Sequence, residues 1–234
     1  MCVLKSLETG NNSIFKNGSE KVFQMPDGSY IYHLNTHETN LTFQEIFIED
    51  VYFKHNLNLP QNSYIFDIGA NIGLFSIQAK IKYPKSYVFS FEPSPELYKL
   101  LFLNTKKFYS TVKTFQCGIS DYNKKVSFYY FPDYSIMSSF FQKTIVDEQI
   151  IQTGIKNNSK TSNKNSKIIS KRLLENFKKL NCQTISLSYF IRGKGIHKID
   201  LLKVDVENLE WIFLKALINK TEKNVINIIT KSHR

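Results

Sequence analysis

The sequence predicts an α/β fold built on a doubly wound, mostly parallel sheet. Short apolar runs such as Tyr64 to Ile68 and Tyr87 to Phe91 alternate with longer segments of helical periodicity, which is typical of such sheets. A glycine-rich turn follows the first run, as at the ligand-binding edge of a doubly wound sheet. With 234 residues, 42% of them hydrophobic, the chain can bury one substantial core.

The elements are expected in a fixed order along the chain. Residues 21–33 predict a hairpin around the turn former Pro26-Asp27-Gly28, and apolar spacing predicts a helix from Leu41 to Lys54. We assign residues 1–60 to an N-terminal hairpin and helix extension and residues 61–234 to the core. The core is expected to contain strands 64–68, 87–91, 112–117, 199–206 and 225–230, an extra strand 126–131, and helices 95–108 and from 74 onward.

The turn between the first core strand and its helix has the chemistry of a ligand-binding loop. Asp67 lies near the strand end, and Gly69 and Gly73 lack side chains, so a ligand can approach the amides of this glycine turn, residues 69–73. Asn71 tolerates the left-handed conformation. The spacing D-x-G-x-N-x-G lacks the third glycine of a dinucleotide fingerprint. It therefore favours S-adenosylmethionine, which has no phosphate.

Glu92 ends the second core strand, nineteen residues after Gly73. A carboxylate at this distance is placed to accept the ribose hydroxyls of an adenine cofactor. The alternative is a solvated strand end before the Pro93 turn. Because carboxyl ends of parallel strands share one edge, Asp67, Glu92 and Gly118 are expected to converge, with Gly118 near the adenine.

Lys203, Asp205 and Glu207 alternate along the fourth core strand and so share one face. Charges on a buried strand are costly, which favours a position at the rim of the cofactor site. The alternative is a mutual Lys203–Asp205 pair with Glu207 capping the next helix. Asp205 is the first candidate for orienting or deprotonating an acceptor, and His233 is the second.

Seven stretches, in order, resemble the FkbM-type methyltransferases, and the similarity is greatest to the subtype within polyketide and non-ribosomal peptide assembly lines. They are MPDGSYIYHL with FQEIFIEDVYFKHNL, FDIGANIGLFSI, VFSFEPSPELYKLL, FQCGISD, FYYFPDYSIMSSF and IDLLKVDVENLEWIFLKAL. The resemblance implies a class I methyltransferase (Rossmann-like) fold and transfer of a methyl group from S-adenosylmethionine, in most relatives to a hydroxyl oxygen. It implies these cofactor-binding residues: Asp67, Gly69, Ala70, Asn71, Gly73, Glu92, Gly118 and Asp205.

The resemblance also suggests an acceptor and a departure from the family pattern. The acceptor is expected to be a small molecule or a carrier-bound intermediate, with Met137, Ser138 and Ser139 bordering its pocket. Relatives usually follow the fifth strand with Glu-x-His, whereas Lys231 and His233 stand here, and the sixth and seventh strands are expected to be missing. A partner chain or neighbouring domain would then complete the sheet edge. A truncated, catalytically silent protein is the alternative.

The net charge of +11 raises the possibility of an RNA 2′-hydroxyl methyltransferase. Eight Lys or Arg but one acid lie in residues 151–180, so the charge is local, and we expect a flexible basic insertion at about residues 152–172. Its lysines recur at helical spacing, but a solvated loop is favoured over a docking strip for an acidic carrier or RNA. Nucleic acid is therefore not the expected partner.

The three cysteines, Cys2, Cys117 and Cys182, are widely spaced and lack metal-ligand spacing, which fits a reducing cytoplasm and no metal site. No apolar run has the length of a membrane span.

Overall fold

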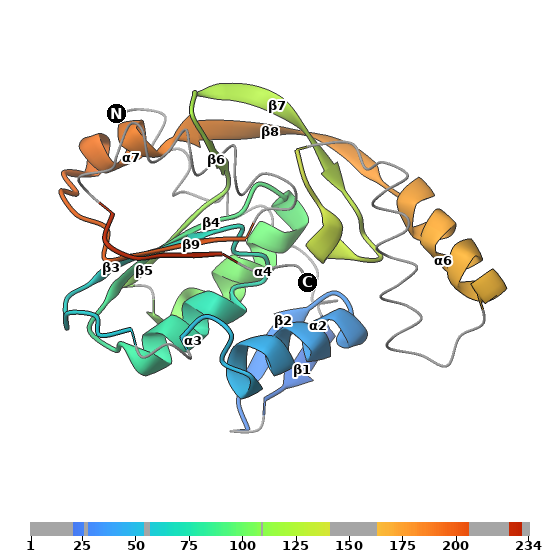
Figure 1. The fold of residues 1–234 in the computed structure, drawn as a ribbon, viewed down its shortest axis with the longest axis horizontal. Helices are drawn as coiled ribbons and strands as arrows, with labels where there is room; N and C mark the ends of the chain where they lie inside the picture. Colours follow the sequence, from blue (N-terminus) through green and yellow to red (C-terminus); the bar gives the residue numbers. More distant parts are fainter. Residues whose placement is uncertain are drawn as a thin grey trace.

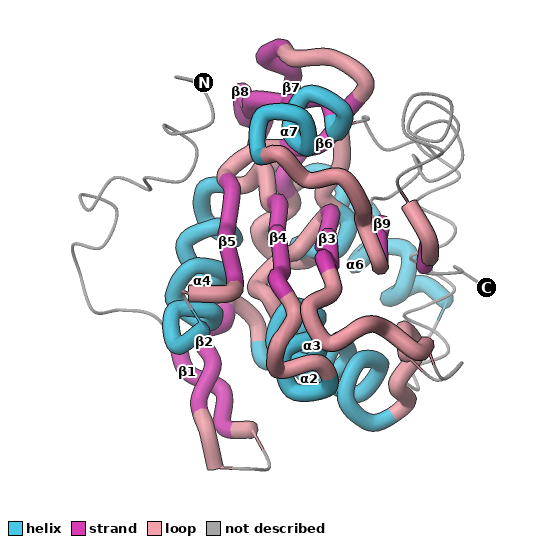
Figure 2. Tube along the Cα trace, turned by 90° about the vertical axis from the view of Figure 1, so that its left-hand side faces the viewer, coloured by secondary structure: helices cyan, strands magenta, loops and turns pink. Residues whose placement is uncertain are grey.

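The computed structural model describes residues 21–25, 28–53, 57–108, 110–140, 163–205 and 225–230. Its centre is a five-stranded parallel sheet in the order β10-β9-β3-β4-β5, which confirms the predicted doubly wound α/β fold. The strands are β3 (Tyr64–Ile68), β4 (Tyr87–Phe91), β5 (Val112–Phe115), β9 (Leu201–Val204) and β10 (Ile228–Thr230). Figure 2 shows β5, β4 and β3 side by side. Chain order reverses between β3 and β9, where ligands bind in such sheets.

Helices cover both faces of this sheet because its strands are apolar on both sides. On one face, Ile65 and Val88 share a core with Phe75 and Ile77 of α3 (Leu74–Lys82) and with α4 (Pro95–Thr105). On the other face, Phe190 of α7 (Leu187–Lys194) packs edge-on against the phenylalanine rings of β3, β4 and β5. Figure 1 shows α3 below the sheet and α7 above it.

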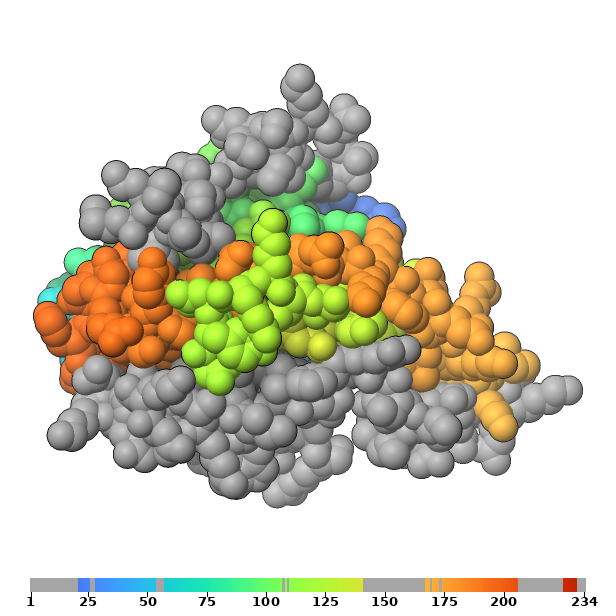
Figure 3. Space-filling model, turned by 90° about the horizontal axis from the view of Figure 1, so that it is seen from above, coloured from blue at the N-terminus to red at the C-terminus, as the bar shows by residue number. Residues whose placement is uncertain are grey.

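A second sheet, in the order β6-β8-β7, lies beside the first. It consists of β6 (Gly118–Ser120), β7 (Lys124–Tyr130) and β8 (Lys178–Ser186). Only β7 was expected, as an extra strand at 126–131. Strand β8 was missed because its partners lie far away in sequence; it runs parallel to β6 and antiparallel to β7. Seen from above, the described surface is mostly yellow-green and orange, the colours of β7 and β8 (Figure 3).

The N-terminal extension packs against α3 and α4. The predicted hairpin is confirmed as β1 (Lys21–Gln24) and β2 (Tyr30–His33). The predicted helix 41–54 is wrong at both ends: α2 (Thr36–Phe43) continues as a π-helical turn, η2 (Gln44–Ile48). Asn35 starts it earlier by accepting the amides of His37 and Glu38, and Asp50, at φ 51°, lies in a turn beyond its end.

The basic insertion differs from the expected loop. Residues 163–172 form most of helix α6 (Asn163–Glu175), while residues 152–162 lie outside the described part of the chain. Leu174 packs against the buried cluster of Phe131 and Met137, so apolar packing outweighs the poor helix propensity of Asn and Ser. Figure 1 shows α6 at the end of the molecule remote from α7. Among the described residues, no helix is both long and apolar enough to cross a membrane.

Candidate active site

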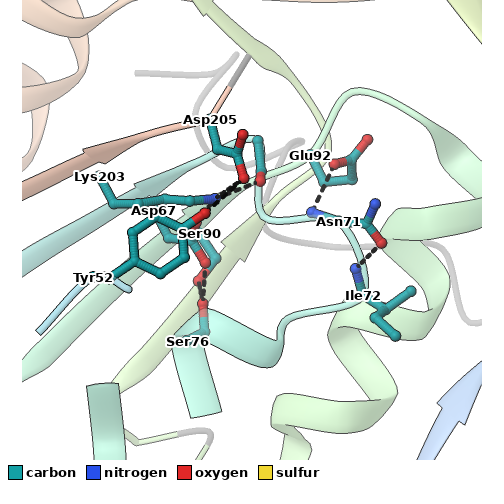
Figure 4. Close-up of polar contacts among 10 residues, drawn as sticks. Tyr52, Asp67, Asn71, Ile72, Ser76, Ser90, Glu92, Lys203 and Asp205 are labelled. Atoms are coloured by element: carbon teal, nitrogen blue, oxygen red, sulfur yellow. Dashed lines mark hydrogen bonds and ion pairs between the residues drawn. The ribbon is translucent and has the colours of Figure 1, made fainter. Parts of the chain in front are cut away.

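A buried ion pair joins β3 to β9 at the point where chain order reverses. Lys203 Nζ lies 3.0 Å from Asp67 Oδ1 and donates to the carbonyl oxygen of Gly69 at 2.8 Å. Asp67 Oδ2 accepts from Ser76 Oγ at 2.7 Å, and the Ser76 and Ser90 hydroxyls are 2.7 Å apart (Figure 4). The Asp67 side chain is fully buried. Asp67 thus holds the start of the glycine turn through Lys203 and presents no exposed oxygen.

The charges around Lys203 keep it protonated. Burial alone would lower its pKa, but the carboxylates of Asp67 and Asp205 outweigh burial and raise the pKa above the ordinary value. The ammonium group also lies 5.8 Å from the centroid of the Tyr52 ring. Lys203 is therefore a fixed positive charge between Asp67 of β3 and Asp205, which follows β9.

Asp205 follows β9 and is the partly exposed member of this group, with 28% of its side chain accessible. Its Oδ2 lies 3.7 Å from Lys203 Nζ and accepts from Tyr52 Oη at 2.9 Å. The expected Lys203–Asp205 pair is therefore present, and Lys203 bridges Asp205 to Asp67, while the position of Asp205 at the rim of a cofactor site stays a prediction. Glu207 lies outside the described residues.

Tyr52, which the sequence analysis did not single out, belongs to this cluster through its hydrogen bond to Asp205. Burial, together with Asp205, raises the pKa of its hydroxyl far above the ordinary value, so Tyr52 remains a hydrogen-bond donor. Its ring packs edge-on against Phe75 at 5.2 Å between centroids. The available signal was the aromatic type itself, because a buried tyrosine hydroxyl needs a partner.

Glu92 forms the second polar group of this edge. Its Oε2 accepts from the amide of Asn71 at 2.9 Å and its Oε1 from the amide of Ser94 at 2.9 Å. The structure thus brings Glu92 against the glycine turn (Figure 4). Only 4% of the residue is exposed, and burial raises the pKa of its carboxyl to about 7 despite the two amides.

The buried Glu92 makes stability depend on pH. Because the folded protein binds a proton at Glu92 more tightly than the unfolded chain, its free energy of unfolding falls as the pH rises from 4.5 to about 7. This loss amounts to about 3 kcal/mol. We expect Glu92→Gln to abolish this part of the pH dependence, as measured by urea unfolding between pH 4 and 8. Parallel curves for both proteins would contradict the assignment.

The glycine turn has the expected backbone but partly different reasons for it. Gly69, Asn71 and Gly73 all have positive φ, at 73°, 51° and 92°. The amides of Gly69 and Ala70 donate to the Phe91 carbonyl oxygen at 3.1 and 3.0 Å. At Gly73 the positive φ favours glycine, and a Cβ there would also lie 2.8 Å from Leu101 Cδ1 of helix α4.

The remaining two predicted positions are Gly118 and His233. Gly118 opens β6 in the second sheet, and a Cβ there would overlap the ring of Phe140. The Phe140 ring therefore fills the space beside Gly118, and a role of Gly118 near the adenine stays a prediction. His233 lies outside the described residues.

Comparison with known proteins gives the family. The profile described as "Methyltransferase FkbM domain" matches residues 67–234. The 31-O-demethyl-FK506 methyltransferase FkbM of Streptomyces tacrolimicus is 26% identical over 91% of this chain and 82% of its own length. Methyltransferase sdnD of Sordaria araneosa is 33% identical over 86% of this chain and 77% of its own.

A third relative is much longer. The AMB antimetabolite synthetase AmbE of Pseudomonas aeruginosa is 30% identical over 89% of this chain, which spans about 10% of that synthetase. The family profile covers well over half of the chain, including the glycine turn, Glu92 and Asp205. The chain therefore belongs to the FkbM family of methyltransferases.

Proposed function

We propose that the chain transfers the methyl group of S-adenosylmethionine to a hydroxyl oxygen of a small molecule or of a carrier-bound polyketide or peptide intermediate. The observation that carries this proposal is the position of Glu92, a buried carboxylate held against the glycine turn by the amides of Asn71 and Ser94. The name of one relative, a 31-O-demethyl-FK506 methyltransferase, supports oxygen as the acceptor atom. The match to about 10% of an antimetabolite synthetase supports a setting within a larger biosynthetic enzyme.

The donor set of this edge fits the cofactor. An adenosine has a ribose diol that donates hydrogen bonds, and a carboxylate oriented by two amides is a suitable acceptor for it. Among the described residues, no arginine contacts this edge, and few turn amides are left for a phosphate. Gly69 and Ala70 donate to Phe91, and Asn71 donates to Glu92. This favours a phosphate-free adenosine, and S-adenosylmethionine when bound supplies an activated methyl group on a sulfonium sulfur.

The protein's own residues would align the acceptor and manage its proton. Asp205 is the partly exposed carboxylate of the edge and can accept a hydrogen bond from an acceptor hydroxyl or take its proton. The Tyr52 hydroxyl and the Lys203 ammonium group both contact Asp205 Oδ2 and hold the carboxylate in place. Because the methyl group is already activated, aligning the reactants supplies a large part of the rate enhancement of methyl transfer.

The cofactor assignment is tested by calorimetry with S-adenosylmethionine and S-adenosylhomocysteine at pH 8. We expect Glu92→Ala to weaken binding by about 1–3 kcal/mol, because the ribose hydroxyls lose their charged acceptor. Glu96→Gln is the matched control: Glu96 lies four residues further on, is exposed and pairs with Lys178 at 2.8 Å. Equal affinity of the Glu92→Ala variant and the wild type would remove Glu92 from the site.

The acceptor class is tested with radiolabelled S-adenosylmethionine offered with small-molecule, carrier-bound and RNA fractions. Label in the first or second fraction is expected. Label confined to RNA would replace the proposal by an RNA methyltransferase, and cofactor binding without transfer to any fraction would favour a silent protein.

A further inference from the structure

A buried carboxylate in the N-terminal extension reaches a turn nearly a hundred residues later. Glu38, in the first turn of α2, accepts from the amide of Ser135 at 3.0 Å, from Ser135 Oγ at 2.5 Å and from the amide of Ile136 at 2.9 Å. Glu38 and Ser135 are 6% and 5% exposed. Three donors converging on one buried carboxylate fix the Ser135 turn, residues Ser135–Met137, in one place.

The same serine also contacts the glycine turn. Asn71 Nδ2 donates to Ser135 Oγ at 3.2 Å, while the Asn71 amide donates to Glu92. One continuous series of hydrogen bonds therefore runs from Glu38 through Ser135 and Asn71 to Glu92. It joins the N-terminal extension, the segment after β7 and the tip of β4, which are distant in sequence.

The Ser135 turn lies beside the carboxyl ends of the sheet strands. Figure 1 shows the segment after β7 descending from the second sheet toward α2 and β2. Met137 is buried in a cluster with Phe131, so the turn is anchored on its apolar side as well. The Ser135 turn therefore lies next to the glycine turn, at the edge of the sheet where a cofactor and an acceptor would bind.

We propose that Glu38 is a positioning residue for the methyl-transfer site: it holds the Ser135 turn against Asn71, and this contact keeps the Asn71 amide and Glu92 in their ligand-binding arrangement. The proposal rests on the proposed function, because it assumes that Glu92 binds the adenosine cofactor. The N-terminal extension then supports two carboxylates of the site. Glu38 acts on Glu92 through Ser135 and Asn71, and Tyr52 donates a hydrogen bond to Asp205.

Glu38→Gln tests this role with little change of shape. The amide group of glutamine would face a backbone N–H where a carboxylate oxygen now accepts, so at least one of the three hydrogen bonds is lost. We expect the Kd for S-adenosylhomocysteine to rise roughly three- to thirty-fold. Ser135→Ala, which removes only the hydroxyl link, is the second variant and should raise the Kd in the same direction if the first one folds poorly.

A purely structural role makes a different prediction, and Asp200→Asn is its control. Asp200 is buried at the opposite edge of the sheet, where its Oδ2 accepts from the Tyr64 amide at 2.9 Å. The Asp200→Asn variant should have a lower melting temperature and an unchanged Kd for S-adenosylhomocysteine. If Glu38→Gln and Ser135→Ala also lower only the melting temperature, Glu38 merely supports the fold and the inference is overturned.

The route through Asn71 is tested by a double-mutant cycle. Asn71→Gly keeps the positive φ accessible but removes the link to Ser135. In that background Glu38→Gln should raise the Kd no further; an undiminished effect would overturn the route. Wild-type protein that binds no S-adenosylhomocysteine would overturn the proposed function itself, whereas equal binding by the wild type and both Glu38 and Ser135 variants would overturn only this inference.

Discussion

Replacing Lys203 by methionine is expected to destabilise the fold by about 3–5 kcal/mol, because Asp67 would be left as a buried carboxylate without its cation. The two groups lie 3.0 Å apart with almost no exposed side chain. Gly69 would also lose the ammonium group that its carbonyl oxygen accepts from. The measurement is the free energy of unfolding in urea at pH 7.5.

Two further variants make this prediction specific. Lys82→Met removes a lysine that also pairs with an aspartate, Asp50, at 2.8 Å, but both side chains are partly exposed. Its cost should stay below about 1 kcal/mol. The double variant D67N/K203M removes both buried charges and should be more stable than Lys203→Met alone. A Lys203→Met variant as stable as Lys82→Met would show that the buried pair does not hold the strand tips together.

Asparagine at position 205 is expected to slow methyl transfer by about 10²–10⁴-fold while leaving cofactor affinity nearly unchanged. The amide keeps the shape of the carboxylate and can still accept from Tyr52 Oη, but it cannot take a proton from an acceptor hydroxyl. The rate is measured as label transferred per minute to the acceptor fraction that the wild type modifies. Affinity is measured by calorimetry with S-adenosylhomocysteine.

Tyr52→Phe is the companion variant, since it retains the Asp205 carboxylate but removes its donor. It should reduce the rate less than Asp205→Asn does and move the acidic limb of the pH–rate profile to higher pH, because the carboxylate loses a hydrogen bond that stabilises its charge. If Asp205→Asn lowers affinity and rate by the same factor, Asp205 belongs to the cofactor site and does not handle the acceptor's proton.

The local sequence pattern was sufficient to predict those elements whose bounds are set by neighbouring residues. The bounds of β3 and β4, the start of α3 and the hairpin of residues 21–33 follow from apolar periodicity and turn chemistry, and the structure agrees with them. The helix before the core was placed too late because Asn35 was not recognised as its N-cap. Strand β8 was missed because its pairing with β6 and β7 is not encoded locally.

The sequence by itself determined the α/β fold, the family, and the approach of Glu92 to the glycine turn, because strand tips and turns have local signatures. Only the tertiary structure decided that Asp67 faces Lys203, 136 residues away, and that Tyr52 reaches Asp205 across 153 residues. Likewise, only the fold connects Glu38 to Ser135. The physical reason is that a buried polar group must find a partner, and packing, not spacing along the chain, selects which one.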